Sequence, residues 1–68
     1  MAEPVYKKIE MVGTSTKSIS DAIASAITKA AETVRNMSWF EVVEQRGSIV
    51  DGKVQQFQVT IRVGFRVD

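Results

Sequence analysis

The sequence contains no cysteine and no histidine among its 68 residues. Their absence excludes disulfide bonds and the usual ligand sets for zinc, attached haem and iron–sulfur clusters. It also excludes catalytic pairs in which a Cys or His side chain supplies the nucleophile or the base. Any functional site in this chain must therefore be built from other residue types.

The chain also lacks a dominant charge and a long apolar run. Nine Lys and Arg residues stand against eight Asp and Glu residues, which gives a net charge of +1. This is not the basic footprint of a dedicated nucleic-acid binder. No apolar run approaches the roughly 20 residues that cross a bilayer, and the N-terminus has no signal-peptide core. We expect a cytoplasmic protein with neither a membrane nor a nucleic-acid partner.

The short length sets a further limit. Residues 1–68 are predicted to form a single domain, and a chain of this size buries only about 60% of its unfolded surface. One small core of this kind rarely supplies more than roughly 3–5 kcal/mol of stability. Because disulfides and the usual structural metals are excluded, self-association is the support that remains, and we expect a homo-oligomer.

The most regular stretch is Gln55–Val67, QQFQVTIRVGFRV. Its apolar set comprises Phe57, Val59, Ile61, Val63, Phe65 and Val67. The polar row between them comprises Gln56, Gln58, Thr60, Arg62, Gly64 and Arg66. This alternation predicts a strand with one buried face and one polar face.

A helix is predicted ahead of that strand. Ser18 followed three residues later by Asp21 resembles a capping box with Asp in place of Glu, and Asn36 supplies a C-terminal stop. The apolar stripe of this helix comprises Ile19, Ala22, Ile23, Ala26, Ile27, Ala30, Val34 and Met37. Its alanines would let the helix lie close to a sheet. A first strand over Val5–Val12 and a loop over Gly13–Lys17 precede it.

The remaining segments complete a β-α-β-β chain of the α+β class. Trp39–Ile49 is predicted to be the second strand, with a bulge or bend at Gly47, and Asp51-Gly52 is a hairpin signal. A crossover helix leaves the first two strands parallel to each other, so the last strand fits between them. The prediction is a three-stranded sheet of order 1-3-2 with one helix packed on one face.

Trp39 is the only tryptophan, and it lies where the predicted helix ends and the second strand begins. Two interpretations remain open from this position. The indole either packs in the core or lies exposed as a stacking platform or interface anchor. If Phe40 and Val42 face the helix, strand alternation places Trp39 and Gln45 on the opposite face.

Other motifs give weaker signals. The loop before the helix has only one of the two glycines that a phosphate-binding loop needs, so nucleotide hydrolysis is not predicted. The acidic residues Glu41, Glu44 and Asp51 show no paired arrangement for acid–base chemistry, and no enzyme activity is predicted. The glutamines of the polar row offer donors and acceptors that suit the mixed edge of a heteroaromatic ring.

Four successive segments resemble the dodecin family over nearly the whole chain. They are VYKKIEMVGTS, the Ser-capped alanine-rich helix, WFEVVEQRG and FQVTIRVGF. The most specific parts are Trp39–Val42 and Phe57–Val59. The resemblance implies a β-α-β-β subunit that assembles into a hollow dodecamer. It also implies a protein that binds flavin for storage and buffering and is not an enzyme.

The same resemblance implies the residues of the site. In dodecins two flavin rings stack together between symmetry-related tryptophans at a two-fold axis, and that tryptophan corresponds to Trp39. A glutamine that hydrogen-bonds the pyrimidine side of the ring corresponds to Gln58, and a basic residue at Arg46 suits a phosphate. Glu44 and Gln45 complete the expected cofactor-binding set. The expected cofactor is FMN, with riboflavin or FAD as alternatives, and some members also bind coenzyme A.

Two rival functions give different expectations. A sheet-based binder of RNA or single strands would stack a base on Trp39 and hold phosphates with Arg46, Arg62 and Arg66; its affinity would fall steeply with salt. A flavoenzyme would need a substrate cavity beside the reactive ring edge, and a stacked flavin pair leaves little room for one. Close stacking on an indole would instead quench the excited flavin by electron transfer.

Overall fold

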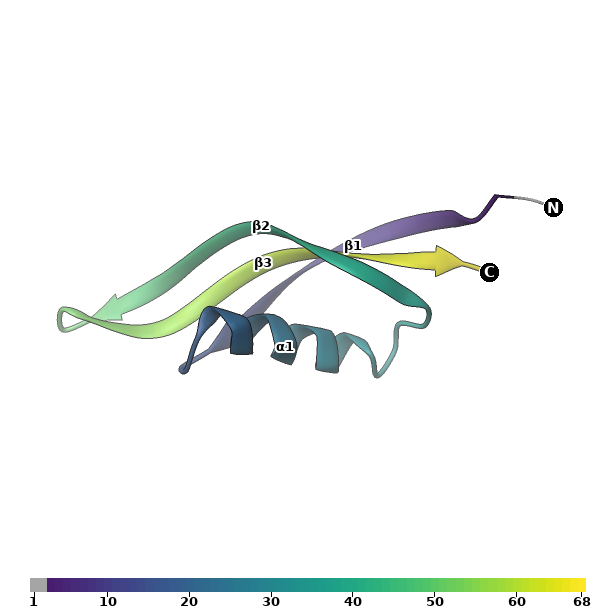
Figure 1. Ribbon diagram of the computed structural model, residues 1–68. Coiled ribbons are helices and arrows are strands. Elements are labelled where there is room, and N and C mark those ends of the chain that lie inside the picture. The colour runs from purple at the N-terminus through teal and green to yellow at the C-terminus, as the bar shows by residue number, and fades with distance from the viewer. Residues whose placement is uncertain (1–2) are drawn as a thin grey trace.

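The computed structural model describes residues 3–68, which form three strands and one helix (Figure 1). In chain order these are β1 (Val5–Ser15), α1 (Ile19–Ala30), β2 (Met37–Val50) and β3 (Lys53–Val67). The sheet has the order β1-β3-β2, and β3 is antiparallel to both neighbours. The predicted β-α-β-β architecture with the last strand at the centre is confirmed.

The core lies on the helix side of β3. Val59, Ile61 and Val63 are fully buried there, and they pack with Ala22 and Ala26 of α1. These three strand residues belong to the apolar set that alternation predicted to face inward. Partly buried residues complete the cluster: Ile9, Met11, Ile19, Ile23, Ile27 and Met37.

Small side chains let α1 lie directly on β1. A methyl group added at Gly13 would overlap the carbonyl oxygen of Ala22 and would lie 2.9 Å from the Cβ of Ala26. Only a residue without a side chain tolerates so close an approach. Gly13 lies in β1, which continues to Ser15. The predicted strand end at Val12, with a loop from Gly13, is therefore wrong.

The N-terminus of α1 is capped as the sequence indicated, with one change of partner. The Ser18 hydroxyl accepts a hydrogen bond from the backbone N–H of Asp21 at 3.0 Å. The Asp21 carboxylate does not return to the backbone of Ser18, as a capping box would require, but accepts a 2.6 Å hydrogen bond from Ser15 Oγ. Ser15 Oγ in turn accepts the backbone N–H of Lys17 at 2.9 Å. Thus a buried serine of β1 ties the strand to the helix start.

The helix is shorter than predicted. It ends at Ala30. The N–H of Ala31 still bonds four residues back, but those of Glu32 and Thr33 bond three residues back, to Lys29 at 3.2 Å and to Ala30 at 3.1 Å. This tightening ends a helix before its apolar periodicity does. The chain then reverses through Asn36, whose φ of 64° lies in the left-handed region. Met37, predicted to be on the helix, instead begins β2.

The β2–β3 hairpin turns at the predicted pair. Asp51 and Gly52 have φ values of 53° and 74°, as a two-residue hairpin turn with left-handed central residues requires. The predicted irregularity at Gly47 is misplaced, because Gly47 is in register with Phe57. The register shifts lie between Met37 and Trp39, between Val42 and Glu44, and between Ser48 and Ile49.

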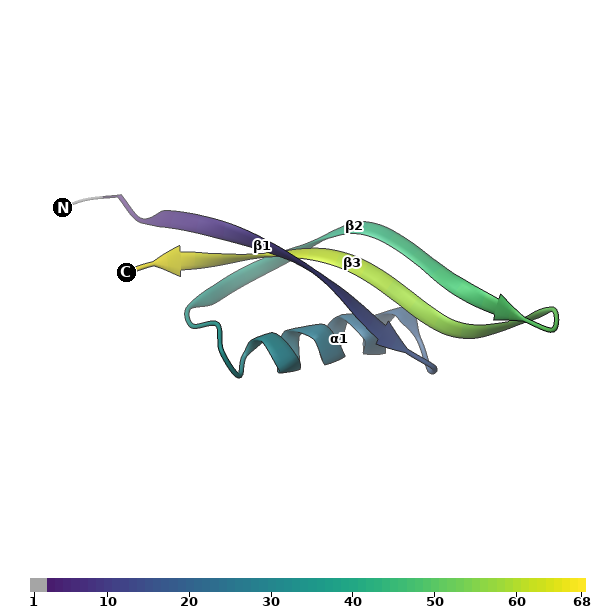
Figure 2. The same cartoon turned by 180° about the vertical axis from the view of Figure 1, so that it is seen from behind.

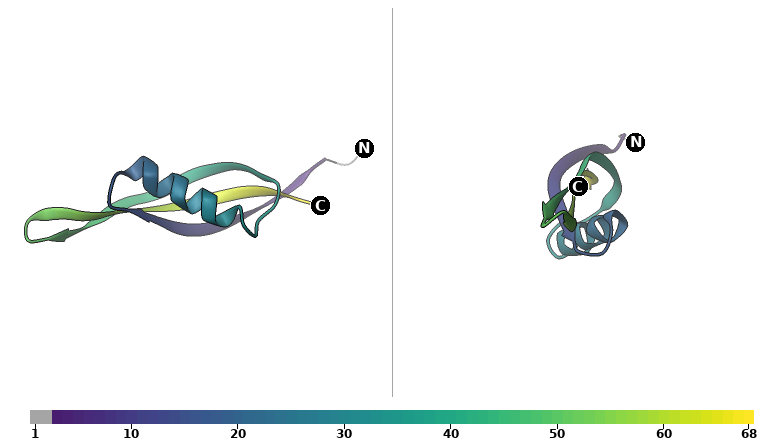
Figure 3. Two further views of the ribbon diagram at one scale, coloured as in Figure 1. Left: turned by 90° about the horizontal axis from the view of Figure 1, so that it is seen from below. Right: turned by 90° about the vertical axis from the view of Figure 1, so that its left-hand side faces the viewer.

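One helix leaves much of the sheet uncovered. The Cα trace extends 57 × 20 × 13 Å, and the β2–β3 hairpin projects well past the start of α1 (Figures 1 and 2). Seen from below, α1 lies along only part of the strands (Figure 3). It packs against β1 and β3. On β2, Phe40 is left 46% exposed beside an apolar hollow of about 430 Å³ next to Ile23 and Ile27, and Ile49 near the hairpin tip is 73% exposed.

No helix within residues 3–68 combines the length and the hydropathy needed to span a membrane.

These uncovered apolar surfaces predict that the chain has no stable folded monomer at micromolar concentration. Native mass spectrometry or analytical ultracentrifugation should show a single large species. Replacing Phe40 by Asp should dissociate it, because the hollow between α1 and β2 would then carry a charge in place of an aromatic ring. Ser25→Asp, on an exposed position of α1, is the matched control and should leave the size unchanged. A cooperatively folded wild-type monomer would contradict the prediction.

Candidate functional site

The candidate site lies on the face of the sheet that is turned away from α1, which we call the open face. It carries the polar row of β3 and the residues in register with that row on both neighbours. Its members are Tyr6, Lys8, Glu10, Val12, Thr14, Trp39, Glu41, Glu44, Arg46, Ser48, Gln56, Gln58, Thr60, Arg62, Gly64 and Arg66. Along β3 they divide into an aromatic end, a charged middle and an amide end.

The aromatic end is formed by Trp39, Gly64 and Tyr6. Trp39 is in register with Gly64, and a methyl group added at Gly64 would overlap the six-membered ring of the indole. The indole therefore lies across the central strand, where it reaches Tyr6 of β1 in an edge-on contact with ring centroids 5.1 Å apart. Trp39 is 41% exposed. The core interpretation of Trp39 is thus wrong for the single chain, and the exposed-platform interpretation fits.

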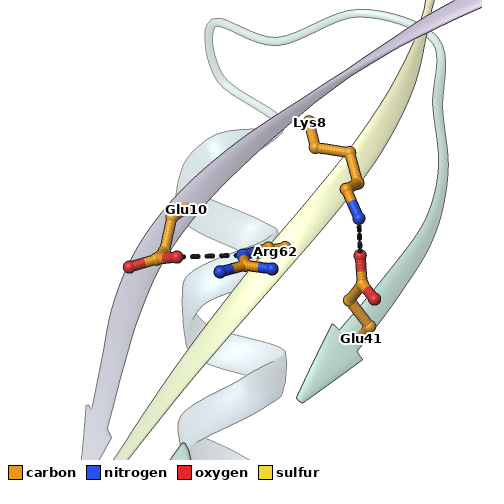
Figure 4. A network of polar contacts seen from close by, with 4 residues as sticks. All are labelled: Lys8, Glu10, Glu41 and Arg62. Atoms are coloured by element: carbon orange, nitrogen blue, oxygen red, sulfur yellow. Dashed lines mark hydrogen bonds and ion pairs between the residues drawn. The ribbon is translucent and has the colours of Figure 1, made fainter. Parts of the chain in front are cut away.

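The charged middle consists of two ion pairs that cross the sheet (Figure 4). Lys8 Nζ lies 2.6 Å from Glu41 Oε1, and Arg62 Nε lies 3.0 Å from Glu10 Oε1. The hydrogen bond from Lys8 lowers the pKa of Glu41 below its ordinary value, the charges of Lys8 and Arg62 act in the same direction, and partial desolvation opposes them. Each basic group therefore has an acidic partner on this part of the open face.

The amide end is a chain of hydrogen bonds. Arg46 Nε donates to Gln58 Oε1 at 2.7 Å, and Gln58 Nε2 donates to Gln56 Oε1 at 2.9 Å. Arg46 and Gln58, both predicted site residues, are thus brought together by the pairing of β2 with β3. A guanidinium group has five N–H donors, so the bond to Gln58 leaves most of its donor capacity for a ligand.

The bulge in β2 changes the side of one predicted residue. Simple alternation from Trp39 placed Gln45 on the open face, and this is wrong. The register shift between Val42 and Glu44 inserts an extra residue, which reverses the alternation beyond it. Glu44 is therefore in register with Thr60 on the open face, and Gln45 is in register with the buried Val59 on the helix side.

Trp39 and Gln58 lie far apart within one chain. Trp39 is in register with Gly64, six residues along β3 from Gln58. At roughly 3.3 Å per residue this separation is about 20 Å, and the charged middle lies between them. One chain therefore does not present its tryptophan and its amide end to the same small ring.

Two residues of the aromatic end were missed by the sequence analysis. Tyr6 lies on a strand whose alternation was irregular in sequence, and Gly64 was counted only as a polar-row residue. The signal was available in part, because Tyr6 lies at the start of the first strand and Gly64 near the end of the antiparallel last one. Their proximity to Trp39 depends on the register, which the sequence did not specify.

Comparison with known proteins identifies close relatives. The dodecin family model matches residues 5–68. A curated dodecin from Thermus thermophilus is 47% identical over 64 residues, which cover 94% of this chain and 93% of the relative. The solved structure of dodecin from Streptomyces coelicolor is 41% identical and superimposes with a TM-score of 0.95, covering 100% of this chain and 97% of the other.

A more distant relative carries a metal in its name. The calcium-chelating immunodominant antigen calcium dodecin from Mycobacterium tuberculosis is 31% identical with a TM-score of 0.81, over 94% of this chain and 91% of the other. Among residues 3–68 of this chain no three Asp, Glu, His or Cys side chains gather in a way that could hold a metal ion. On the open face, Glu41 and Glu10 instead pair with Lys8 and Arg62.

The Lys8–Glu41 pair predicts a specific pH response. Since the pKa of Glu41 is lowered, the ionised pair should persist as the pH falls below the ordinary range of glutamate. Its small stabilising contribution is present above the unfolded-state pKa and is lost as the pH falls through the folded-state pKa. Lys8→Gln should raise the pKa of Glu41, as measured by a carboxyl-carbon NMR titration.

Lys7→Gln provides the control for this titration. It removes the same charge, but Lys7 is in register with Phe65 and faces the other side of the sheet. An unchanged Glu41 titration in the Lys8 variant, or an equal shift in both variants, would show that the pairing in Figure 4 does not control this carboxyl.

Proposed function

This chain belongs to the dodecin family, and from that membership and the geometry of the open face we propose that it binds flavin as a storage and buffering protein. FMN or riboflavin would be held as stacked pairs between tryptophans at subunit interfaces. The role is one of binding, not catalysis.

The observation that carries the proposal is the placement of Trp39. The indole lies over Gly64, half exposed, at one end of a face that is mostly polar. A flat, electron-rich ring held against the sheet offers its outer side to another flat ring, and aromatic pairs of this kind gain about 0.5–1.5 kcal/mol beyond their area burial.

The separation of Trp39 from Gln58 supports a site shared between subunits. A flavin stacked on Trp39 of one chain would meet the amide end of another chain. Such sharing requires a symmetric assembly, and a hollow dodecamer with flavin pairs at its two-fold axes satisfies it. The polar open face and the uncovered surface of β2 would then supply ligand contacts and subunit contacts, respectively.

The amide end has the donors and acceptors that a flavin requires. Gln58 would bond the pyrimidine side of the ring, whose edge presents both carbonyl oxygens and an N–H group. The remaining N–H groups of Arg46 would hold the phosphate of FMN. Stacking on indole would also quench the excited flavin by electron transfer, so that storage suppresses its photochemistry. Binding of FAD or of coenzyme A stays a prediction.

The rival role in binding RNA or single strands has no support. The comparisons identify dodecins. On the open face, Arg62 and Lys8 form ion pairs with carboxylates. Arg46 is hydrogen-bonded to Gln58. Arg66 is in register with Tyr6 at the aromatic end, and the two ion pairs separate it from Arg46. The basic groups therefore do not form a continuous surface along which a phosphate backbone could lie.

Substitution of Trp39 tests the proposal. Trp39→Ala should leave the assembly intact, because the indole is not part of the core, and should weaken flavin binding by roughly tenfold or more as stacking is lost. Trp39→Phe should retain weaker binding and leave the bound flavin brighter, because phenylalanine is a much poorer electron donor than indole. Flavin fluorescence titrations with size measurements in parallel check both. An intact Trp39→Ala assembly that still binds and quenches flavin would refute the proposal.

The roles of Gln58 and Arg46 are separated by the choice of ligand. Gln58→Ala should weaken the binding of FMN and of riboflavin equally, by about 1–3 kcal/mol, because both ligands share the ring edge.

Arg46→Ala should weaken FMN binding more than riboflavin binding, and added salt should narrow the difference. Part of its effect will fall on both ligands, since Arg46 also positions Gln58. Equal losses for the two ligands in the Arg46 variant would remove it from the phosphate role.

A further inference from the structure

The aromatic end raises the question of what fixes the orientation of Trp39. β2 is an edge strand, and a half-exposed side chain on an edge strand can choose among several staggered rotamers. A stacking platform needs the ring to be held in a single rotamer. Two residues outside the predicted site restrict the choice, and they come from two other strands.

Gly64 provides the space that the ring occupies. It is the only glycine of β3, and it is buried although it lies on the open face. The six-membered ring of Trp39 covers it, and even a methyl group at this position would overlap ring atoms. Any other residue at position 64 would therefore force the indole away from the sheet.

Tyr6 limits the movement of the ring at its far side. It lies on β1, across the central strand from Trp39, and the two rings meet edge to face at an interplanar angle of 63° with centroids 5.1 Å apart. Tyr6 is itself 43% exposed, so it contributes little to the core. The geometry of this contact is the one that aromatic quadrupoles favour.

We propose that Gly64 and Tyr6 form a seat that holds the indole of Trp39 across β3, and that Tyr6 is a positioning residue for ligand stacking. Gly64 supplies the vacant space, and Tyr6 blocks rotation of the ring toward β1. A ring that is already oriented loses less freedom when a flat ligand stacks on it. The proposal rests on the proposed function only for its effect on flavin, because the seat itself is present in the free protein.

The single tryptophan and single tyrosine make the seat directly observable. In flavin-free protein, Gly64→Ala and Tyr6→Leu should lower the fluorescence anisotropy of Trp39 and change its near-UV circular dichroism. Tyr6→Phe keeps the ring edge and should restore the anisotropy, and it also controls for the lost tyrosine signal. Val5→Ala, an exposed neighbour in β1, should change neither signal.

Flavin titration of the same variants then measures the consequence. Gly64→Ala and Tyr6→Leu should weaken binding by roughly twofold to tenfold, the range expected for one lost aromatic pair, and Tyr6→Phe should bind nearly as wild type. If wild type fails to bind flavin, the proposed function fails, while anisotropy and dichroism still decide the seat. If both spectroscopic signals are unchanged in Gly64→Ala and Tyr6→Leu, the seat is refuted even when wild type binds.

A double-mutant cycle covers the case in which Gly64→Ala damages the assembly. The thermal unfolding midpoint should fall more when Gly64→Ala is made in the wild-type protein than when it is made on a Trp39→Phe background. The smaller phenyl ring does not reach as far over β3, so the added methyl group has room there. Equal falls on both backgrounds would show that Gly64 serves the strand and not the indole, and would overturn the proposal.

Discussion

A 12-residue helix cannot cover a 15-residue strand, and most of this structure follows from that mismatch. The helix is about 18 Å long, whereas β3 extends for about 50 Å. Burial is therefore complete only around Val59, Ile61 and Val63, where β3 passes beneath α1. The hairpin, most of the helix side of β2 and the open face have no cover within the chain. Exposed apolar surfaces of this kind mark sites where another chain makes contact.

In the proposed role, the open face divides its functions along β3. Ion pairs occupy its middle and neutralise their own charges, so neither ring stacking nor phosphate binding falls there. The indole and the amide chain lie at opposite ends, and no side chain of one subunit joins them. A ligand that uses both ends must join two subunits. The charged middle then acts as a spacer, because it keeps the two half-sites of one chain from forming an incomplete site together.

Periodicity predicted the fold well, because the relevant interactions are local or involve whole faces. Alternation predicted the buried side of β3, and the alanines in the apolar stripe of α1 predicted its close packing on the sheet. Asp51-Gly52 predicted the turn. The errors have a common cause, since bulges and strand register depend on tertiary packing. One extra residue between Val42 and Glu44 moved Gln45 to the other face, and register alone brought Tyr6 and Gly64 to Trp39. The pairing of Arg46 with Gln58 likewise needed the register.

A site shared between subunits couples the ligand to the assembly. In the proposed role, a flavin that contacts Trp39 of one chain and the amide end of another would bind only the assembled form. By mass action it would stabilise that form by RT ln(1 + [L]/Kd), which is about 2.7 kcal/mol at a hundredfold excess over Kd. The reverse also holds, since linkage is reciprocal. Any change that loosens the subunit contacts would lower the affinity for the ligand. The seat of Trp39 differs in this respect, because all its parts come from one chain. It can therefore be complete before assembly, and only the second half of the site has to be supplied by a partner.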